Sequence, residues 1–188
     1  MGGTERPATN EEGSSSSATR QATDAGVYVV AAAGNDGASD DGDIASPGSV
    51  RLAISVGATT KEGNVWVNSS IGSSFNEDGS QRLFPHQKPE IVAPGHEIIS
   101  TGEDSRWYLS SGTSDATVFV AGALALLLEA NPALKSSNNE DSSCLELVKR
   151  TLADTAVPLG EPGHDARSGY GLLQANALVE ALDDVSAC

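Results

Sequence analysis

A long apolar segment in the second half of the chain constrains the fold most. Residues 114–130 are apolar nearly all round, a pattern typical of a helix buried at the centre of a domain. Asn131 and Pro132 follow this segment and are expected to end the helix. The longest unbroken apolar run, residues 118–128, is shorter than the roughly 20 residues that cross a bilayer, so we expect no membrane span.

The rest of the chain alternates between strand-like and helical patterns, which predicts an α/β fold. Residues 27–33 form a continuous apolar run with β-branched members, typical of a strand buried on both faces in a parallel sheet. We therefore expect one domain over residues 1–188, a largely parallel sheet flanked by helices. Further strands are predicted at 52–58, 90–93 and 98–100, further helices at 17–25, 143–153 (with a capping box of Ser143 and Glu146) and 173–182, and irregular structure at 1–16 and 60–86.

The charge of the chain excludes one class of partner. A net charge of −15, from 26 acidic and 11 basic side chains, repels phosphate backbones, so we expect no nucleic-acid partner. An acidic coat with few lysines suits a high-salt environment, where screening removes the self-repulsion. The alternative is an acidic protein of an ordinary environment. The full apolar complement, 38% of residues, argues against a disordered acidic tail.

The two cysteines and the N-terminus bear on the cellular compartment. Cys144 and Cys188 form no metal-binding cluster. They are expected to be free thiols, unless the fold brings their Cα atoms within about 7 Å. The first residues show no signal-peptide pattern, which fits a cytoplasmic protein or a chain whose true beginning is missing.

The SGTSDAT motif at residues 111–117 is the first candidate for chemistry. Ser114 lies at the mouth of the predicted apolar helix, where helix N–H groups converge and stabilise negative charge. A serine there suits nucleophilic attack on a carbonyl, with the resulting oxyanion held by those N–H groups. The alternative is a serine that simply caps the helix.

A second candidate follows the first predicted strand. Asn35 comes directly after Ala33 and Gly34 at the strand's end, so its amide NH₂ could point at the same oxyanion. The alternative is an ordinary turn asparagine beside glycine.

Taken together, four motifs resemble a known family. The order AAAGNDG, SPGSVRLAISVGATT, KPEIVAPG and SGTS-x-A-x-x-x-VAGALALLL is similar to the C-terminal half of subtilisin-like serine proteases, and the resemblance covers residues 1–182. It implies an α/β subtilisin-like fold and a serine endopeptidase activity on polypeptides. It also implies secretion, no required cofactor, and calcium sites for which no ligand is assigned here, although Asp40, Asp41 and Asp43 form an acidic loop.

The resemblance also implies roles for individual residues. Ser114 matches the nucleophile, and Asn35 matches the side-chain oxyanion donor, with the Ser114 backbone N–H as the second donor. Gly2, Gly3, Ala33 and Gly34 are expected to line the substrate cleft, where an extended peptide would pair with the protein backbone.

The catalytic base is the main departure from the family. The mechanism needs a histidine to take the serine proton and an aspartate to orient it, and the family carries both N-terminal to the serine. His86, His96 and His164 match no such context and are expected to be surface or loop residues. The missing N-terminal part of the domain is thus an expected partner. Alone, the chain should be nearly inert and should aggregate or be molten, with an exposed sheet edge and an uncovered core face.

Two other functions compete with the protease hypothesis. A non-catalytic remnant or peptide-binding module would keep the cleft without the base. A nucleotide-binding domain is disfavoured, because the chain has neither G-x-G-x-x-G nor G-x-x-x-x-G-K-[ST].

Two milder departures lie beside the nucleophile. Asp115 replaces an apolar residue that is common in the family. Its charge suits the first turn of a helix, yet it could oppose a nearby oxyanion. Val118 and Phe119 replace a usual Pro-His pair and are expected to be buried in the helix.

Overall fold

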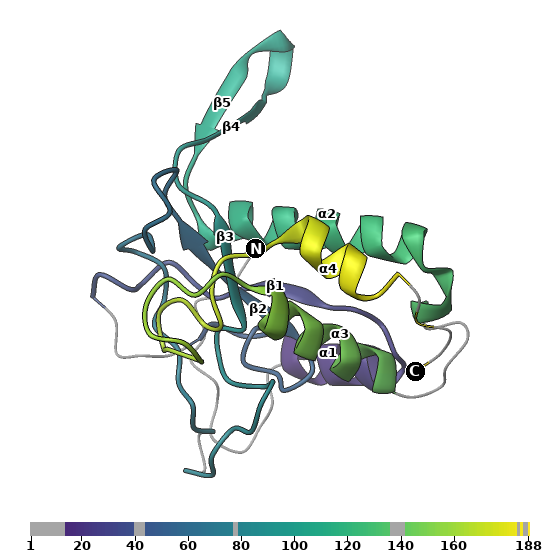
Figure 1. Cartoon of the computed structure of the whole chain (residues 1–188). Coiled ribbons are helices and arrows are strands. Elements are labelled where there is room, and N and C mark those ends of the chain that lie inside the picture. Colours follow the sequence, from purple (N-terminus) through teal and green to yellow (C-terminus); the bar gives the residue numbers. More distant parts are fainter. Residues whose placement is uncertain (1–13, 40–43, 77–78, 136–141, 184, 186–187) are drawn as a thin grey trace.

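The computed structural model describes residues 14–39, 44–76, 79–135, 142–183, 185 and 188. Figure 1 shows strands at the centre, helices around them and one hairpin projecting outward. The helices are α1 (Ser14–Asp24), α2 (Thr113–Ala130), α3 (Ser143–Thr155) and α4 (Ala175–Ala181), with short 3₁₀ turns η1 (Glu103–Ser105) and η2 (Pro132–Leu134). The strands are β1 (Val30–Ala32), β2 (Ile54–Thr59), β3 (Ile91–Pro94), β4 (Ile98–Thr101) and β5 (Trp107–Ser110).

The central sheet confirms the predicted parallel α/β arrangement. Its order is β1-β2-β3, with Val30 of β1 opposite Ile54 of β2, and Val56 of β2 opposite Ile91 of β3, all in parallel register. Every residue of β2 is buried, as a continuous apolar strand in such a sheet requires. β1 is shorter than expected, because it begins only at Val30.

α2 is the helix on which the sheet packs. It contacts all three strands, and α4 lies against both α2 and α3. Val120, Leu124 and Leu127 of α2 are at most 3% exposed and join Ile54 and Val56 in the core. By length and composition alone α2 could also cross a membrane. The core helix of a globular domain has the same composition, and the packing of α2 on the sheet is that of a core helix.

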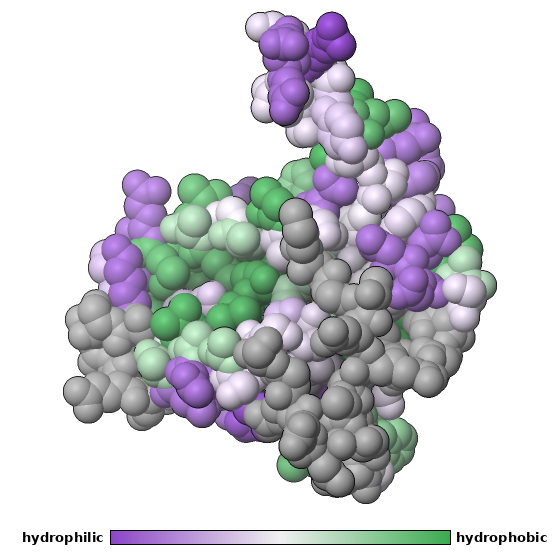
Figure 2. Space-filling view, turned by 180° about the vertical axis from the view of Figure 1, so that it is seen from behind, coloured by the Kyte–Doolittle hydropathy of each residue, from purple (hydrophilic) through white to green (hydrophobic). Residues whose placement is uncertain are grey.

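One face of α2 is uncovered, which corrects the prediction that Val118 and Phe119 are buried. Val118 is 69% exposed, Phe119 45% and Leu126 58%. The small residues at 121, 122 and 125 are exposed as well. Figure 2 shows hydrophobic residues gathered in a broad patch on the back of the molecule, below the projecting hairpin. We call the exposed positions 118, 119, 121, 122, 125 and 126 the α2 face.

The edge of the sheet is open next to β1. β1 pairs with β2 on one side, and no strand pairs with its other side in the described part of the chain. Parallel strands are normally covered on both edges and faces. The expectation of an exposed edge and an uncovered core face is thus met by β1 and the α2 face together.

The hairpin of β4 and β5 was only half predicted. β4 was expected, but β5 was missed, and the two pair in antiparallel register with Ile99 opposite Leu109 and Thr101 opposite Trp107. Ile99, Trp107 and Leu109 are all at least 60% exposed. The hairpin projects from the body (Figure 1), so its apolar residues are not part of the core. The strands were predicted from the apolar runs of buried strands, and β5 is not buried.

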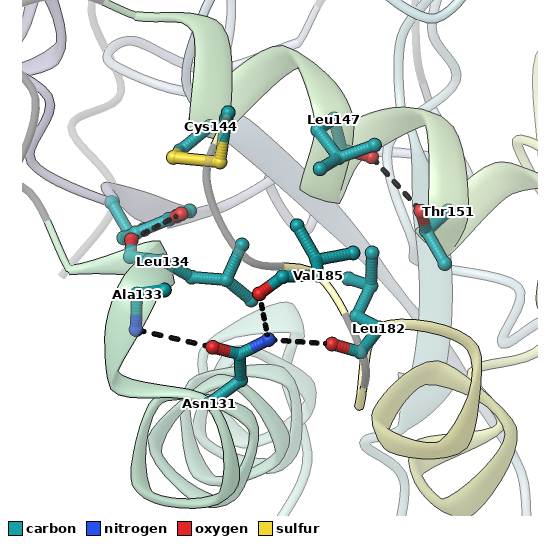
Figure 3. The surroundings of a disulfide bond; sticks show 10 residues. Asn131, Ala133, Leu134, Cys144, Leu147, Thr151, Leu182 and Val185 are labelled. Atoms are coloured by element: carbon teal, nitrogen blue, oxygen red, sulfur yellow. Dashed lines mark hydrogen bonds between the residues drawn. A yellow bond between two sulfur atoms is a disulfide. The ribbon is translucent and has the colours of Figure 1, made fainter.

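The cysteines form a disulfide, so the prediction of free thiols was wrong. Cys144 of α3 is bonded to Cys188, with Cα atoms 5.0 Å apart. Figure 3 shows the surroundings of this disulfide, among them Asn131, whose Nδ2 donates to the carbonyls of Leu182 and Val185. The two cysteines are 44 residues apart in the sequence, and no residue pattern indicated that they pair. The pairing depends on the fold, which brings the end of the chain back to α3. Closing such a loop stabilises the folded state by about 3–4 kcal/mol.

A buried ion cluster joins α3 to the sheet. Lys88 and Lys149 each lie within 2.8 Å of one Glu90 carboxylate oxygen, and all three side chains are at most 2% exposed. Each lysine also donates to the Ala53 carbonyl, and the other Glu90 oxygen accepts the Ser55 N–H. Burial holds the pKa of Lys88 well below its usual value. These bonds fix the segment that leads into β2.

Glu146 corrects the predicted capping box. α3 has Ser142 as its N-cap, with no side-chain capping bond. The Glu146 carboxylate instead accepts a 2.5 Å bond from Arg51 and lies 3.6 Å from His86. His86 lies in a loop, as expected, but it is buried.

The first prediction concerns the α2 face. The wild-type chain should self-associate through this apolar surface, whereas Val118→Lys with Leu126→Lys should keep it monomeric, because lysine charges resist burial. Light scattering coupled to size exclusion measures the mass. The matched control is Val67→Lys with Leu83→Lys, which alters two exposed apolar residues outside the α2 face and should still associate. A wild-type monomer with a sharp cooperative melt would contradict the prediction.

The second prediction concerns His86. Burial, with the nearby charges of Lys149 and Arg51, lowers its pKa to about 4. Between pH 6.5 and 4 the unfolded chain therefore binds a proton that the folded chain does not, so stability falls as the pH falls. Through this group, acidification from pH 7 to 4.5 should cost about 2 kcal/mol.

Urea unfolding of the monomeric Val118→Lys, Leu126→Lys chain, followed by tryptophan fluorescence, measures this loss. Substituting His86→Gln in that background should make the acid loss smaller by the same amount. Equal losses with and without His86 would show that its titration is not linked to folding.

Candidate active site

Ser114 and Asn35 lie where the chain leaves β1 and enters α2. Asn35 follows β1 by three residues, and Ser114 is the second residue of α2. Both residues are exposed. The N-cap of α2 is Gly112, not Ser114, and this residue has no side chain to cap the helix. Ser114 is therefore not the N-cap residue of α2, which excludes the alternative that it simply caps the helix.

Thr113 joins the two segments. Its backbone N–H and its hydroxyl donate to Asn35 Oδ1, over 2.9 and 3.0 Å. The Gly34 N–H donates to the same hydroxyl over 3.1 Å. Because the amide oxygen of Asn35 is held in this way, its Nδ2 faces away from Thr113 with its hydrogens available. The sequence motif contained Thr113, but nothing in the residue pattern assigned it this role.

The candidate oxyanion donors border the same space. A methyl group placed on Gly112 would lie 3.5 Å from Asn35 Nδ2 and 3.6 Å from the Ser114 backbone nitrogen. Gly112 has an extended backbone, with φ 172°, which any residue can adopt. The absence of a side chain there therefore leaves the space between these donors open and is not needed for the backbone conformation. Two N–H donors around one small gap are the arrangement that stabilises a developing oxyanion.

The expected substrate-binding residues are only partly described. Gly2 and Gly3 lie outside the described residues. Ala33 is fully buried, its N–H donates to Val56 and its carbonyl accepts from Ala45. The Gly34 N–H and carbonyl are likewise bonded, to Thr113 and Ser70. The backbone groups of Ala33 and Gly34 are therefore bonded within the chain, and both residues are buried. Their expected place in the substrate cleft stays a prediction.

Gly34 itself is required for conformational and steric reasons. Its φ of +116° is one that side chains rarely adopt, and a Cβ would lie 2.6 Å from Ser70 Oγ. Ser70 Oγ also accepts the Asp36 N–H. The turn that presents Asn35 thus depends on glycine and on the hydroxyl of Ser70.

None of the three histidines is bonded to Ser114 in the described part of the chain. The His96 ring makes a 2.9 Å hydrogen bond with Ser111 through Nδ1 and stacks on Trp66. His164 bonds the Pro89 carbonyl, and burial lowers its pKa. His86 is buried beside Glu146. All three lie in loops, as expected, and the described residues provide no base for Ser114.

Metal binding is not supported by the described residues. Within the described ranges no group of three His, Cys, Asp or Glu side chains could hold an ion. The acidic loop of Asp40, Asp41 and Asp43, which was considered for calcium, lies outside them.

Asn35 Nδ2 and the Ser114 backbone nitrogen thus lie close together, at the points where the chain leaves β1 and enters α2. Residues 3–171 match the model of the Subtilase family of peptidases. The chain is 33% identical over 166 residues to an intracellular serine protease of Paenibacillus polymyxa, covering 87% of this chain and 44% of that protein. It is 35% identical over 160 residues to subtilisin Savinase of Lederbergia lenta, covering 85% and 49%. The chain therefore belongs to the Subtilase family.

Solved structures agree with this assignment. The patellamide maturation protease PatA superposes with a TM-score of 0.69 and 26% identity, over 96% of this chain and 60% of that one. The prenylagaramide maturation protease PagA gives 0.66 and 28%, over 88% and 54%. The predicted subtilisin-like fold is confirmed, and this chain spans about half the length of the curated relatives it matches.

The third prediction concerns Thr113. Thr113→Val keeps the shape of this fully buried side chain but removes the hydroxyl that bonds Asn35 and Gly34. We expect a loss of about 1–3 kcal/mol, because polar partners are left unpaired. Nuclear magnetic resonance should also show the Asn35 side-chain amide becoming more mobile, because its oxygen keeps only the bond from the backbone N–H at position 113.

Urea unfolding of the monomeric Val118→Lys, Leu126→Lys variant measures the stability. Thr113→Ser, which retains the hydroxyl, is the control and should lose much less. An Asn35 amide that stays ordered in Thr113→Val would refute the positioning role.

Proposed function

We propose that this chain carries the nucleophile and oxyanion donors of a serine endopeptidase. Ser114 Oγ gives its proton to a base and attacks a peptide carbonyl, and Asn35 Nδ2 and the Ser114 N–H bind the oxyanion. The C–N bond then breaks, the amine leaves with the proton, and an acyl-enzyme remains, which water hydrolyses. The observation that carries the proposal is the shared gap beside Gly112, with Asn35 Nδ2 and Ser114 N both within 3.6 Å of one point. Membership of the Subtilase family supports it.

The base must come from outside the described residues, and we assign it to the N-terminal half of a subtilisin-like domain. The chain spans about half of its relatives, β1 has an open edge, and the α2 face is uncovered. On a helix, residues four apart share a face, so Ser114 lies in line with Val118. A partner that covers the α2 face would therefore reach Ser114 as well.

A non-catalytic peptide-binding module remains the second candidate for the chain by itself. The favouring observation is that no histidine is bonded to Ser114 within the described ranges. The two functions differ in a single measurable respect, the hydrolysis of a peptide once the domain is complete.

We further propose that the protein matures in an oxidising compartment and is secreted. The Cys144–Cys188 disulfide supports this, because such bonds persist mainly in secreted proteins. Relatives do not decide the matter, since one of them is named an intracellular serine protease.

The fourth prediction tests the proposed activity. Joining this chain to the N-terminal half of subtilisin Savinase should give a domain that hydrolyses a peptide anilide, whereas the chain alone should not. Ser114→Ala should abolish the activity, by on the order of a millionfold in kcat as in subtilisin itself. Asn35→Ala should lower kcat by roughly 100- to 1000-fold, which is also the size known from subtilisin and not one derived from this geometry.

Circular dichroism should show that both variants fold as the joined protein does, and mass spectrometry should find an acyl adduct on Ser114. Activity that survives Ser114→Ala would refute the nucleophile. A folded but inactive joined domain would favour the peptide-binding module.

A further inference from the structure

Asp115 places a carboxylate beside the gap that the oxyanion donors border. It follows Ser114 in the first turn of α2. A methyl group on Gly112 would lie 3.5 Å from Asp115 Oδ2, as it would from Asn35 Nδ2. One carboxylate oxygen thus borders the same small space as the groups that would bind a negative oxyanion.

Contacts with the protein hold this carboxylate in place. Ser110 Oγ donates to Asp115 Oδ1 over 2.5 Å, so the side chain is drawn toward the end of β5. The N-terminus of α2 also stabilises its negative charge. These contacts fix Oδ1 and leave Oδ2 toward the gap.

No cation of the described residues neutralises Asp115. Ser111, four residues before Asp115, accepts the Glu97 N–H. Lys61 lies 4.0 Å from Glu97 and is thus directed to another carboxylate. The His96 ring is bonded to Ser111. The mouth of the site therefore carries uncompensated negative charge.

Such a charge has a cost that a substrate can offset. A carboxylate a few ångströms from a forming oxyanion raises the energy of the transition state. A positive side chain of the substrate, placed near Asp115, would cancel this repulsion and would be attracted in the ground state too. A neutral or acidic side chain at that place would not.

We propose that Asp115 is a specificity-determining residue that selects peptides with Lys or Arg next to the scissile bond. This inference rests on the proposed peptidase function. Asp115 Oδ2 and Asn35 Nδ2 each lie 3.5 Å from the same point beside Gly112. A substrate side chain next to the scissile bond would therefore lie within reach of the carboxylate.

The test compares peptides that differ only in one residue next to the scissile bond, Lys or Glu, with the domain joined to the N-terminal half of subtilisin Savinase. The wild-type domain should prefer Lys by tenfold or more in kcat/KM, and Asp115→Asn should reduce that preference by roughly tenfold. Asp115→Asn should also raise kcat for a neutral peptide. Asp154→Asn, at an exposed position of α3, is the matched control and should leave the preference unchanged.

A second arm does not need turnover. In the Ser114→Ala background, binding of the same two peptides is measured by fluorescence anisotropy with and without Asp115→Asn. Charge-dependent binding that Asp115→Asn removes supports the inference even if hydrolysis is absent, an outcome that would overturn only the proposed activity. A Lys preference that persists in Asp115→Asn, or no preference in the wild type, overturns the inference.

Discussion

The contact between Thr113 and Asn35 is the interaction on which the candidate site depends. It joins segments 78 residues apart in the sequence, one leaving β1 and one entering α2. A parallel sheet brings the carboxyl ends of its strands to one edge, and the hydrogen bonds of Thr113 then fix the orientation of a single exposed amide. Without them Asn35 would be a mobile turn residue, and the gap beside Gly112 would have one defined donor instead of two.

The opposite ends of the strands, where β2 and β3 begin, hold contacts that stabilise the fold. The cluster of Lys88, Glu90 and Lys149 lies where the chain enters β2 and β3, away from Asn35 and Ser114. A buried pair contributes little net stability compared with apolar residues, but loss of one partner is costly because a charge is left unpaired. The disulfide adds a second constraint at α3. The charges that stabilise the fold are thus buried at the amino ends of the strands, whereas the candidate site lies at their carboxyl ends.

Hydrophobic surface determines what this chain needs from outside. α2 covers the sheet with one face and presents Val118, Phe119 and Leu126 on the other, next to an unpaired strand edge. Both features are unfavourable in water and become favourable when another layer covers them. Because Ser114 and Val118 lie four residues apart on α2, a layer that covered the α2 face would also approach Ser114.

The sequence by itself determined the fold class, and it predicted the two residues of the candidate site. Apolar runs bounded by glycine-rich turns predicted the parallel strands, because local patterns record burial and turn geometry, and four motifs in order pointed to Ser114 and Asn35. The tertiary structure alone decided the contacts between distant segments: the Thr113 bonds to Asn35, the occupied backbone of Ala33, and the disulfide. It also decided that α2 is covered on one face only, since an apolar helix has the same sequence whether or not a neighbour covers it.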